Sequence, residues 1–66
     1  MPTKLYLRRN GSFGASCDGV EDTGHHITED SGRFTVYSLN DPDVTLCENV
    51  YRSAAEAAIE REWRAS

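Results

Sequence analysis

The chain has 66 residues, of which 38% are hydrophobic and 27% charged, and its formal net charge at pH 7 is −4. This length predicts one domain over residues 1–66 with a small core, too small for an internal substrate pocket, so an enzyme is not expected. No apolar run approaches the roughly 20 residues that span a bilayer. The first residues also lack the apolar stretch of a signal peptide, so we expect a cytoplasmic protein.

Charge is distributed unevenly along the chain. Residues 1–16 contain three basic and no acidic residues, and residues 49–66 contain three of each. Residues 17–48 contain eight acidic residues against the single basic Arg33. We call these eight the acidic block: Asp18, Glu21, Asp22, Glu29, Asp30, Asp41, Asp43 and Glu48. Such a block repels nucleic-acid phosphates and attracts basic protein surfaces, although acidic residues also serve simply as a solvated surface.

The first part of the chain predicts a β-hairpin. Residues 4–8 alternate polar and apolar, and residues 13–17 alternate again after an Asn-Gly turn. A two-residue loop would put the apolar residues of the two strands on opposite faces of the hairpin. A three-residue loop instead pairs Leu7 with Phe13 and places Gly11 where a positive φ is required. We therefore predict the three-residue loop.

The middle of the chain predicts one long loop and a second hairpin. Residues 18–32 are glycine-rich and acidic and read mainly as an exposed loop, with a short strand possible around 25–28. Residues 33–39 alternate as a strand with Phe34 and Val36 on one face. An Asn-Asp-Pro-Asp turn follows, and the next strand runs from Val44 to Val50.

The end of the chain predicts a helix over residues 53–63. Ser53 and Glu56 have the spacing of a capping box, and one apolar stripe comprises Ala55, Ala58, Ile59 and Trp63. The expected fold is α+β, an antiparallel sheet of three to four strands in two hairpins with this helix packed on one face. The expected core contains Leu5, Leu7, Phe13, Phe34, Val36, Leu46, Val50, Ile59 and Trp63.

The cysteines and histidines do not form a recognisable motif. Cys17 and Cys47 lie at predicted strand ends, where a disulfide is conceivable, but a cytosolic protein keeps its thiols reduced. Together with His25 and His26 they lack the paired close spacing of zinc sites. We therefore expect no metal and no cofactor, and we interpret the histidines as exposed loop residues.

A very small, acidic, single cytosolic domain without a catalytic motif resembles the type I anti-CRISPR proteins of phages and mobile elements. The resemblance covers the whole chain in size, charge and lack of motifs, and those proteins share no motif from which residue roles could be transferred. It implies a protein-binding inhibitor in the host-cell cytoplasm that mimics nucleic acid and blocks DNA binding by a CRISPR surveillance complex or similar effector. We accordingly expect a monomer that binds a protein through the acidic block and binds neither nucleic acid nor membrane.

A second resemblance comes from the order of the last elements. The strands at Arg33–Leu39 and Val44–Val50 and the Ser53-x-x-Glu56-Ala57 helix start are similar to the three-stranded-sheet-plus-helix domains of integrase arm-binding and AP2 type. That resemblance implies a small DNA-binding module. The reading strands of those domains are basic, whereas the turn at residues 40–43 is acidic here. DNA binding would therefore need basic residues gathered on one face.

Overall fold

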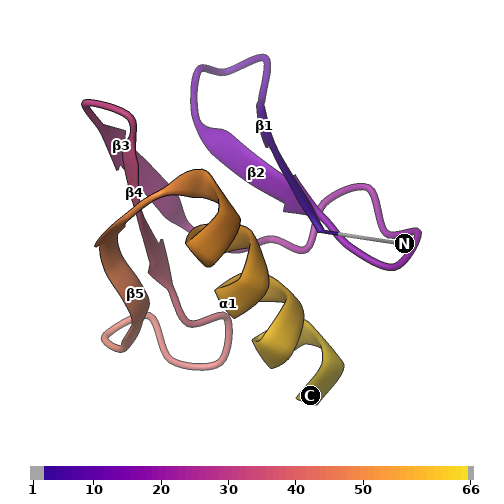
Figure 1. Cartoon of the computed structure of the whole chain (residues 1–66). Helices are drawn as coiled ribbons and strands as arrows, with labels where there is room; N and C mark the ends of the chain where they lie inside the picture. The colour runs from indigo at the N-terminus through magenta and orange to yellow at the C-terminus, as the bar shows by residue number, and fades with distance from the viewer. Residues whose placement is uncertain (1–2, 66) are drawn as a thin grey trace.

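The computed structural model describes residues 3–65, which form five strands followed by one helix (Figure 1). The elements are β1 (Lys4–Leu7), β2 (Phe13–Ser16), β3 (Ile27–Asp30), β4 (Arg33–Tyr37), β5 (Thr45–Val50) and α1 (Arg52–Ala65). The α+β class and the C-terminal helix are confirmed, with one strand more than the upper expectation. Within residues 3–65 no helix is long and apolar enough to cross a membrane.

The strands form one antiparallel sheet in the order in which they occur in the chain. Leu7 pairs with Phe13 and Gly11 has a φ of +89°, so the three-residue loop of the first hairpin is confirmed. The extra strand, β3, pairs with β4 through a tight turn at Ser31-Gly32. Both turn residues have positive φ, 52° and 81°, as a type I′ hairpin requires. The sequence left a short strand possible around residues 25–28, and the strand that forms overlaps this range but runs from Ile27 to Asp30.

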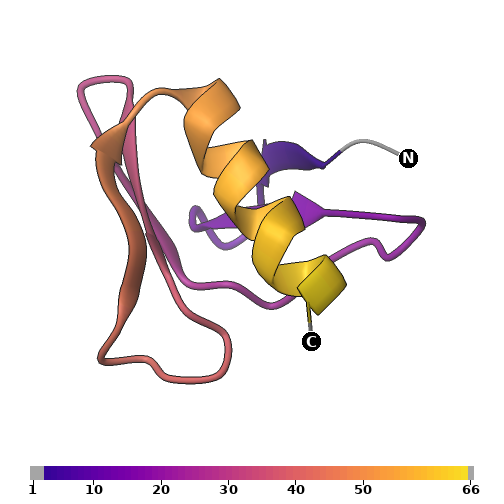
Figure 2. The same cartoon turned by 60° about the horizontal axis from the view of Figure 1, so that its bottom comes forward.

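The sheet is strongly curved, and α1 lies across its concave side (Figure 2). Strands β2 and β3 share only one registered pair, Phe13 with Ile27, so the first hairpin can turn away from the other three strands. Strands β4 and β5 are interrupted by register shifts, and Asn49 in this region has a φ of 56°. Such bulges bend and twist a strand.

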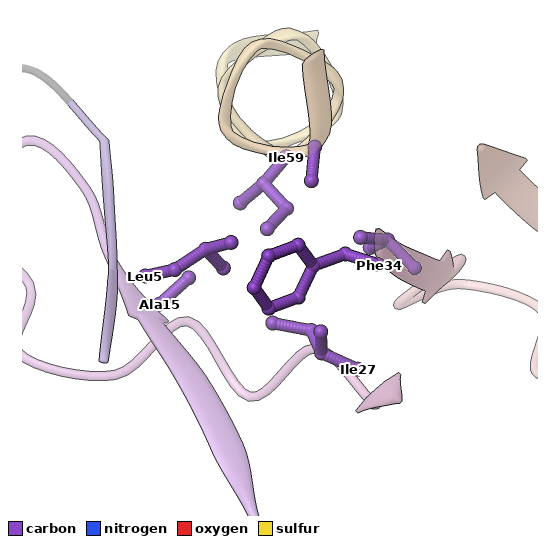
Figure 3. Close-up of a cluster of buried hydrophobic side chains, with 7 residues drawn as sticks. Leu5, Ala15, Ile27, Phe34 and Ile59 are labelled. Carbon is purple, nitrogen blue, oxygen red and sulfur yellow. The ribbon is translucent and has the colours of Figure 1, made fainter. Parts of the chain in front are cut away.

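The core lies between the helix and this curved sheet. The Phe34 ring sits at the centre of the buried cluster, with Leu5 and Ala15 on one side, Ile27 below and Ile59 reaching down from α1 (Figure 3). Strands β1, β2, β3 and β4 and the helix thus all contribute side chains to one cluster. Burying these side chains is what holds the curved sheet on the helix.

The expected core is correct in part. Four of its nine members are buried (Leu5, Phe34, Val36, Ile59) and four are half-buried (Phe13, Leu46, Val50, Trp63). Leu7 is 63% exposed, although it shares the face of Leu5. Trp63, one of the expected core residues on the helix, is only half-buried, and the fully buried helix residues are Ala55 and Ile59.

The predicted capping box is not formed. The helix begins at Arg52, and the Ala55 N–H donates to the Tyr51 carbonyl at 3.1 Å. The Glu56 carboxylate instead accepts from the Leu5 N–H at 2.9 Å, and the Arg52 guanidinium donates to the Leu5 carbonyl at 3.2 Å. Helix side chains therefore satisfy both backbone groups of Leu5 at a sheet edge that could otherwise pair with another chain.

Two leucines of β1 offer a matched test of this packing. We predict that Leu5→Ala lowers the free energy of unfolding by about 2–5 kcal/mol, because it opens a cavity beneath the helix. Leu7→Ala removes the same atoms from a mainly exposed site and should change stability by no more than about 0.5 kcal/mol. Urea unfolding followed by circular dichroism measures both. Equal losses for the two variants would contradict the observed position of the core.

Candidate binding site

A half-buried carboxylate joins three segments that are distant in sequence. Oε1 of Glu62, on α1, accepts hydrogen bonds from Nε2 of His25 at 2.8 Å and from the Leu39 N–H at 2.9 Å. Its Oε2 accepts from the Ser38 hydroxyl at 2.6 Å. On the other side of the imidazole, Nδ1 of His25 lies 2.7 Å from the Thr23 hydroxyl. We call these five residues the Glu62 clamp.

The charge state of Glu62 follows from its surroundings. Burial raises the pKa of this carboxyl, but the hydrogen bonds from the Leu39 N–H, the Ser38 hydroxyl and His25 outweigh burial and hold the pKa below its ordinary value. Glu62 is therefore ionised at neutral pH. An ionised carboxylate can only accept, so Nε2 of His25 carries a hydrogen in this contact.

The expectation that both histidines are exposed loop residues is wrong for His25, which is 0% exposed, whereas His26 is exposed. The physical reason is that the chain before β3 is already extended and alternates buried and exposed positions. Thr23, His25 and Ile27 point inward at every second residue. This alternation is the sequence signal that could have predicted the burial of His25. It is hard to recognise because two of the inward positions, Thr23 and His25, hold polar residues.

The clamp fixes the two walls of a surface groove. His25 lies between Gly24 and His26, while Ser38 and Leu39 directly follow β4. The groove has a volume of about 420 Å³ and is lined by Gly24, His26, Tyr37, Ser38, Leu39 and Pro42. Because one carboxylate binds residues from both walls, the width of the groove is set by hydrogen bonds inside the protein.

Aromatic and apolar surface dominates this groove. The rings of His26 and Tyr37 are 5.1 Å apart at their centroids and tilted by 49°, and the Tyr37 N–H donates to the His26 carbonyl at 2.9 Å. Leu39 is 41% exposed and Val44, at the end of the same loop, is 48% exposed. Exposed apolar side chains beside a groove are typical of binding surfaces.

The clamp contains the residue types of a hydrolytic triad but cannot act as one. His25 is fully buried and Thr23 is 6% exposed, so a substrate cannot reach the hydroxyl. Both ring nitrogens of His25 are already engaged. A catalytic base must lie within hydrogen-bond reach of the proton it removes from the substrate. The clamp is therefore a structural element that positions the groove.

The cysteines do not form a bridge, and the described residues contain no cluster suited to a metal. Both Cys17 and Cys47 are free thiols. Burial raises the pKa of the Cys47 thiol, so this cysteine is less nucleophilic than an exposed one. Across residues 3–65, no group of three or more histidine, cysteine or acidic side chains is arranged to hold a metal ion.

Two members of the acidic block are paired with arginines. Asp18 binds Arg64 through contacts of 2.8 and 3.0 Å, and Asp22 binds Arg8 through contacts of 2.9 and 3.0 Å. These hydrogen bonds lower the pKa of both carboxyls. The Arg8 guanidinium also lies directly over Gly14, where a Cβ would meet Nε at 2.7 Å. Asp18 and Asp22 thus tie the loop after β2 to the rest of the domain.

Five other members of the block lie on the second half of the sheet. They are exposed and have no ion pair within the described part of the chain: Glu29, Asp30, Asp41, Asp43 and Glu48. We call them the β3–β5 acidic surface. Two are the last residues of β3, before the β3–β4 turn, and two are in the β4–β5 loop, so the two pairs lie toward opposite ends of β4 (Figures 1 and 2). The eighth residue, Glu21, is exposed in the loop after β2. The block is therefore spread over several regions.

Comparison of the chain with protein-family models, with curated proteins and with solved structures returned no match.

Glu62 provides a test of the clamp. We predict that Glu62→Gln lowers the free energy of unfolding at pH 7 by about 1–3 kcal/mol, because a neutral amide loses the charge-assisted hydrogen bonds of the carboxylate and its NH₂ cannot accept from the Ser38 hydroxyl. Glu48→Gln makes the same chemical change at an exposed site and should cost no more than about 0.5 kcal/mol. Urea unfolding measures both, and equal effects would contradict the clamp.

The same carboxyl predicts a pH dependence. The pKa of Glu62 is lowered from its ordinary value of 4.5, so its stabilising contribution is complete above that value and is lost as pH falls toward the lower folded pKa. Asp18 and Asp22 act in the same direction. Unfolding curves between pH 7 and pH 2 should show acid destabilisation that is shallower in Glu62→Gln. An identical slope in wild type and variant would contradict this assignment.

Proposed function

We propose that the protein is a protein-binding inhibitor that uses the β3–β5 acidic surface to occupy the basic groove of a nucleic-acid-binding partner. The observation that carries this proposal is the exposure of five unpaired carboxylates on one half of the sheet. The one basic residue of that half, Arg33, stacks on the Tyr51 ring at 4.3 Å and donates to its hydroxyl. Arg33 keeps its positive charge in these contacts, and one guanidinium cannot offset five carboxylates, so this half of the sheet remains net negative.

Two of these carboxylates are held in place by hydrogen bonds from backbone N–H groups. Oε2 of Glu29 accepts from the Gly32 N–H at 2.9 Å, and Oδ1 of Asp41 accepts from the Asp43 N–H at 3.1 Å. Ordered carboxylates lose little conformational entropy when a partner binds. Their charge also accelerates the encounter with a basic surface. A CRISPR surveillance complex that binds DNA through lysines and arginines is the partner class implied by the anti-CRISPR resemblance.

A small DNA-binding module is the second candidate. Alternation along β1 and β4 places Lys4, Tyr6, Arg33 and Tyr37 on the sheet face that the helix does not cover. Basic and aromatic side chains on an open sheet are suited to contact phosphates and bases. Against this candidate, Arg8 is already occupied by Asp22 and by the Phe13 carbonyl at 2.6 Å. We therefore rank DNA binding second.

One experiment separates the two candidates. The protein is titrated against labelled duplex DNA at low salt, and then against a purified DNA-binding surveillance complex with its labelled target. We expect no direct DNA binding and a loss of target binding by the complex. Salt-sensitive binding of the duplex by the protein itself, without inhibition, would favour the DNA-binding module and overturn the proposal.

Charge reversal tests which acidic residues attract the partner. We predict that Asp43→Lys combined with Glu48→Lys slows association with the partner about tenfold at low salt, with a smaller effect at high salt. These residues are preferable to Asp22 or Asp41, whose carboxylates hold the structure together. Stopped-flow or surface-binding kinetics provide the rate.

A matched pair of single variants controls for net charge. Glu48→Lys changes the β3–β5 acidic surface, and Glu21→Lys makes the same change in the loop after β2. We expect the first variant to slow association more than the second. If both slowed it equally, only net charge would matter and the surface assignment would be wrong.

A further inference from the structure

The groove beside the β3–β5 acidic surface is formed before any partner binds. Its walls, residues 24–26 and 37–42, are joined by the Glu62 clamp and by the hydrogen bond from the Tyr37 N–H to the His26 carbonyl. A site held in this way needs little reorganisation to accept a side chain. Gly24, with a φ of +87°, adds no side chain that would fill the groove.

The lining of the groove indicates the chemistry of its occupant. The rings of His26 and Tyr37 offer aromatic surface for a flat group, and Leu39 and Pro42 offer apolar surface for a hydrocarbon stem. Within residues 3–65, the groove lining includes no lysine or arginine. Two carboxylates, Asp41 and Asp43, flank Pro42 in the chain and are exposed.

We propose that this groove binds an arginine side chain on the basic surface of the partner. The methylene stem lies along Leu39 and Pro42, and the planar guanidinium stacks on the aromatic rings near the acidic loop. Guanidinium is planar and weakly hydrated and stacks on aromatic faces, whereas the ammonium of lysine is compact and strongly hydrated. The inference rests on the proposed function and specifies it, because it adds an anchoring pocket to the electrostatic surface.

A titration with small probes tests the occupant directly. ¹⁵N–¹H spectra of the wild-type protein are recorded with N-acetyl-arginine amide, with its lysine counterpart and with N-acetyl-norleucine amide, an uncharged hydrocarbon control. We expect the arginine probe to shift the amides of Gly24, His26 and Leu39 in a saturable manner. Its affinity should exceed that of the norleucine and lysine probes at least about threefold. Equal binding of norleucine, or shifts only outside the groove, would overturn the proposal.

Two tyrosines supply matched variants. Tyr37→Leu keeps apolar bulk in the groove and removes the aromatic face, so it should weaken the arginine probe at least about threefold while leaving norleucine unchanged. Tyr51→Leu removes an exposed ring that does not line the groove and should change neither affinity. If Tyr37→Leu fails to fold by circular dichroism, His26→Leu at the exposed ring replaces it, with the same expected result. An unchanged arginine affinity would overturn the proposal.

Kinetics with the partner separate this inference from the proposed function. We expect Tyr37→Leu to increase the dissociation rate of the complex at least about threefold, whereas Glu48→Lys mainly slows association. If only Glu48→Lys has an effect, the inhibitor assignment stands and the arginine groove is wrong. If the groove binds the arginine probe but the protein does not inhibit the surveillance complex, the proposed function is wrong and the groove remains an arginine site.

Discussion

The structure depends on one half-buried carboxylate. Glu62 projects from the last part of the helix and accepts hydrogen bonds from His25, Ser38 and the Leu39 backbone. A domain of this size has few apolar residues with which to hold its loops, and charge-assisted hydrogen bonds are among the strongest contacts available to it. The clamp therefore attaches the segment before β3 and the segment after β4 to the helix. Within the described part of the chain, every buried side-chain nitrogen and oxygen atom has a hydrogen-bond partner.

The helix thus has two roles, one carried by its apolar side chains and the other by its charged side chains. Its apolar residues Ala55 and Ile59 cover the core, and its charged residues attach the edges and loops of the sheet. Glu56 and Arg52 bind the backbone of Leu5, and Arg64 binds Asp18. A helix surface that appears balanced in charge is therefore largely engaged within the protein. The second half of the sheet lies away from these pairs and carries a net negative charge.

The proposed binding surface follows from this division of charge. Arg8, directly after β1, and Arg64 of the helix pair with two of the three acidic residues in the loop after β2, whereas the turns and edge of β3–β5 contain only Arg33 as a basic residue. The groove lies beside the β4–β5 loop. The Glu62 clamp supports its walls, and His25 of the clamp is fully buried. Long-range attraction and a preformed pocket are thus adjacent, an arrangement in which charge sets the association rate and packing sets the dissociation rate.

Local patterns in the sequence determined the first hairpin and the helix. The register of Leu7 with Phe13 follows from the turn at Gly11 and from alternation within a few residues, and helix formation follows from alanine-rich composition. Only the tertiary structure decided the burial of His25, the use of Glu56 at Leu5 instead of at the helix cap, and the groove. The reason is distance along the chain. Glu62 is 37 residues from His25, and Glu56 is 51 residues from Leu5. A polar side chain becomes an interior residue only when folding brings its partner to it, and neither residue carries a local signal of that partner.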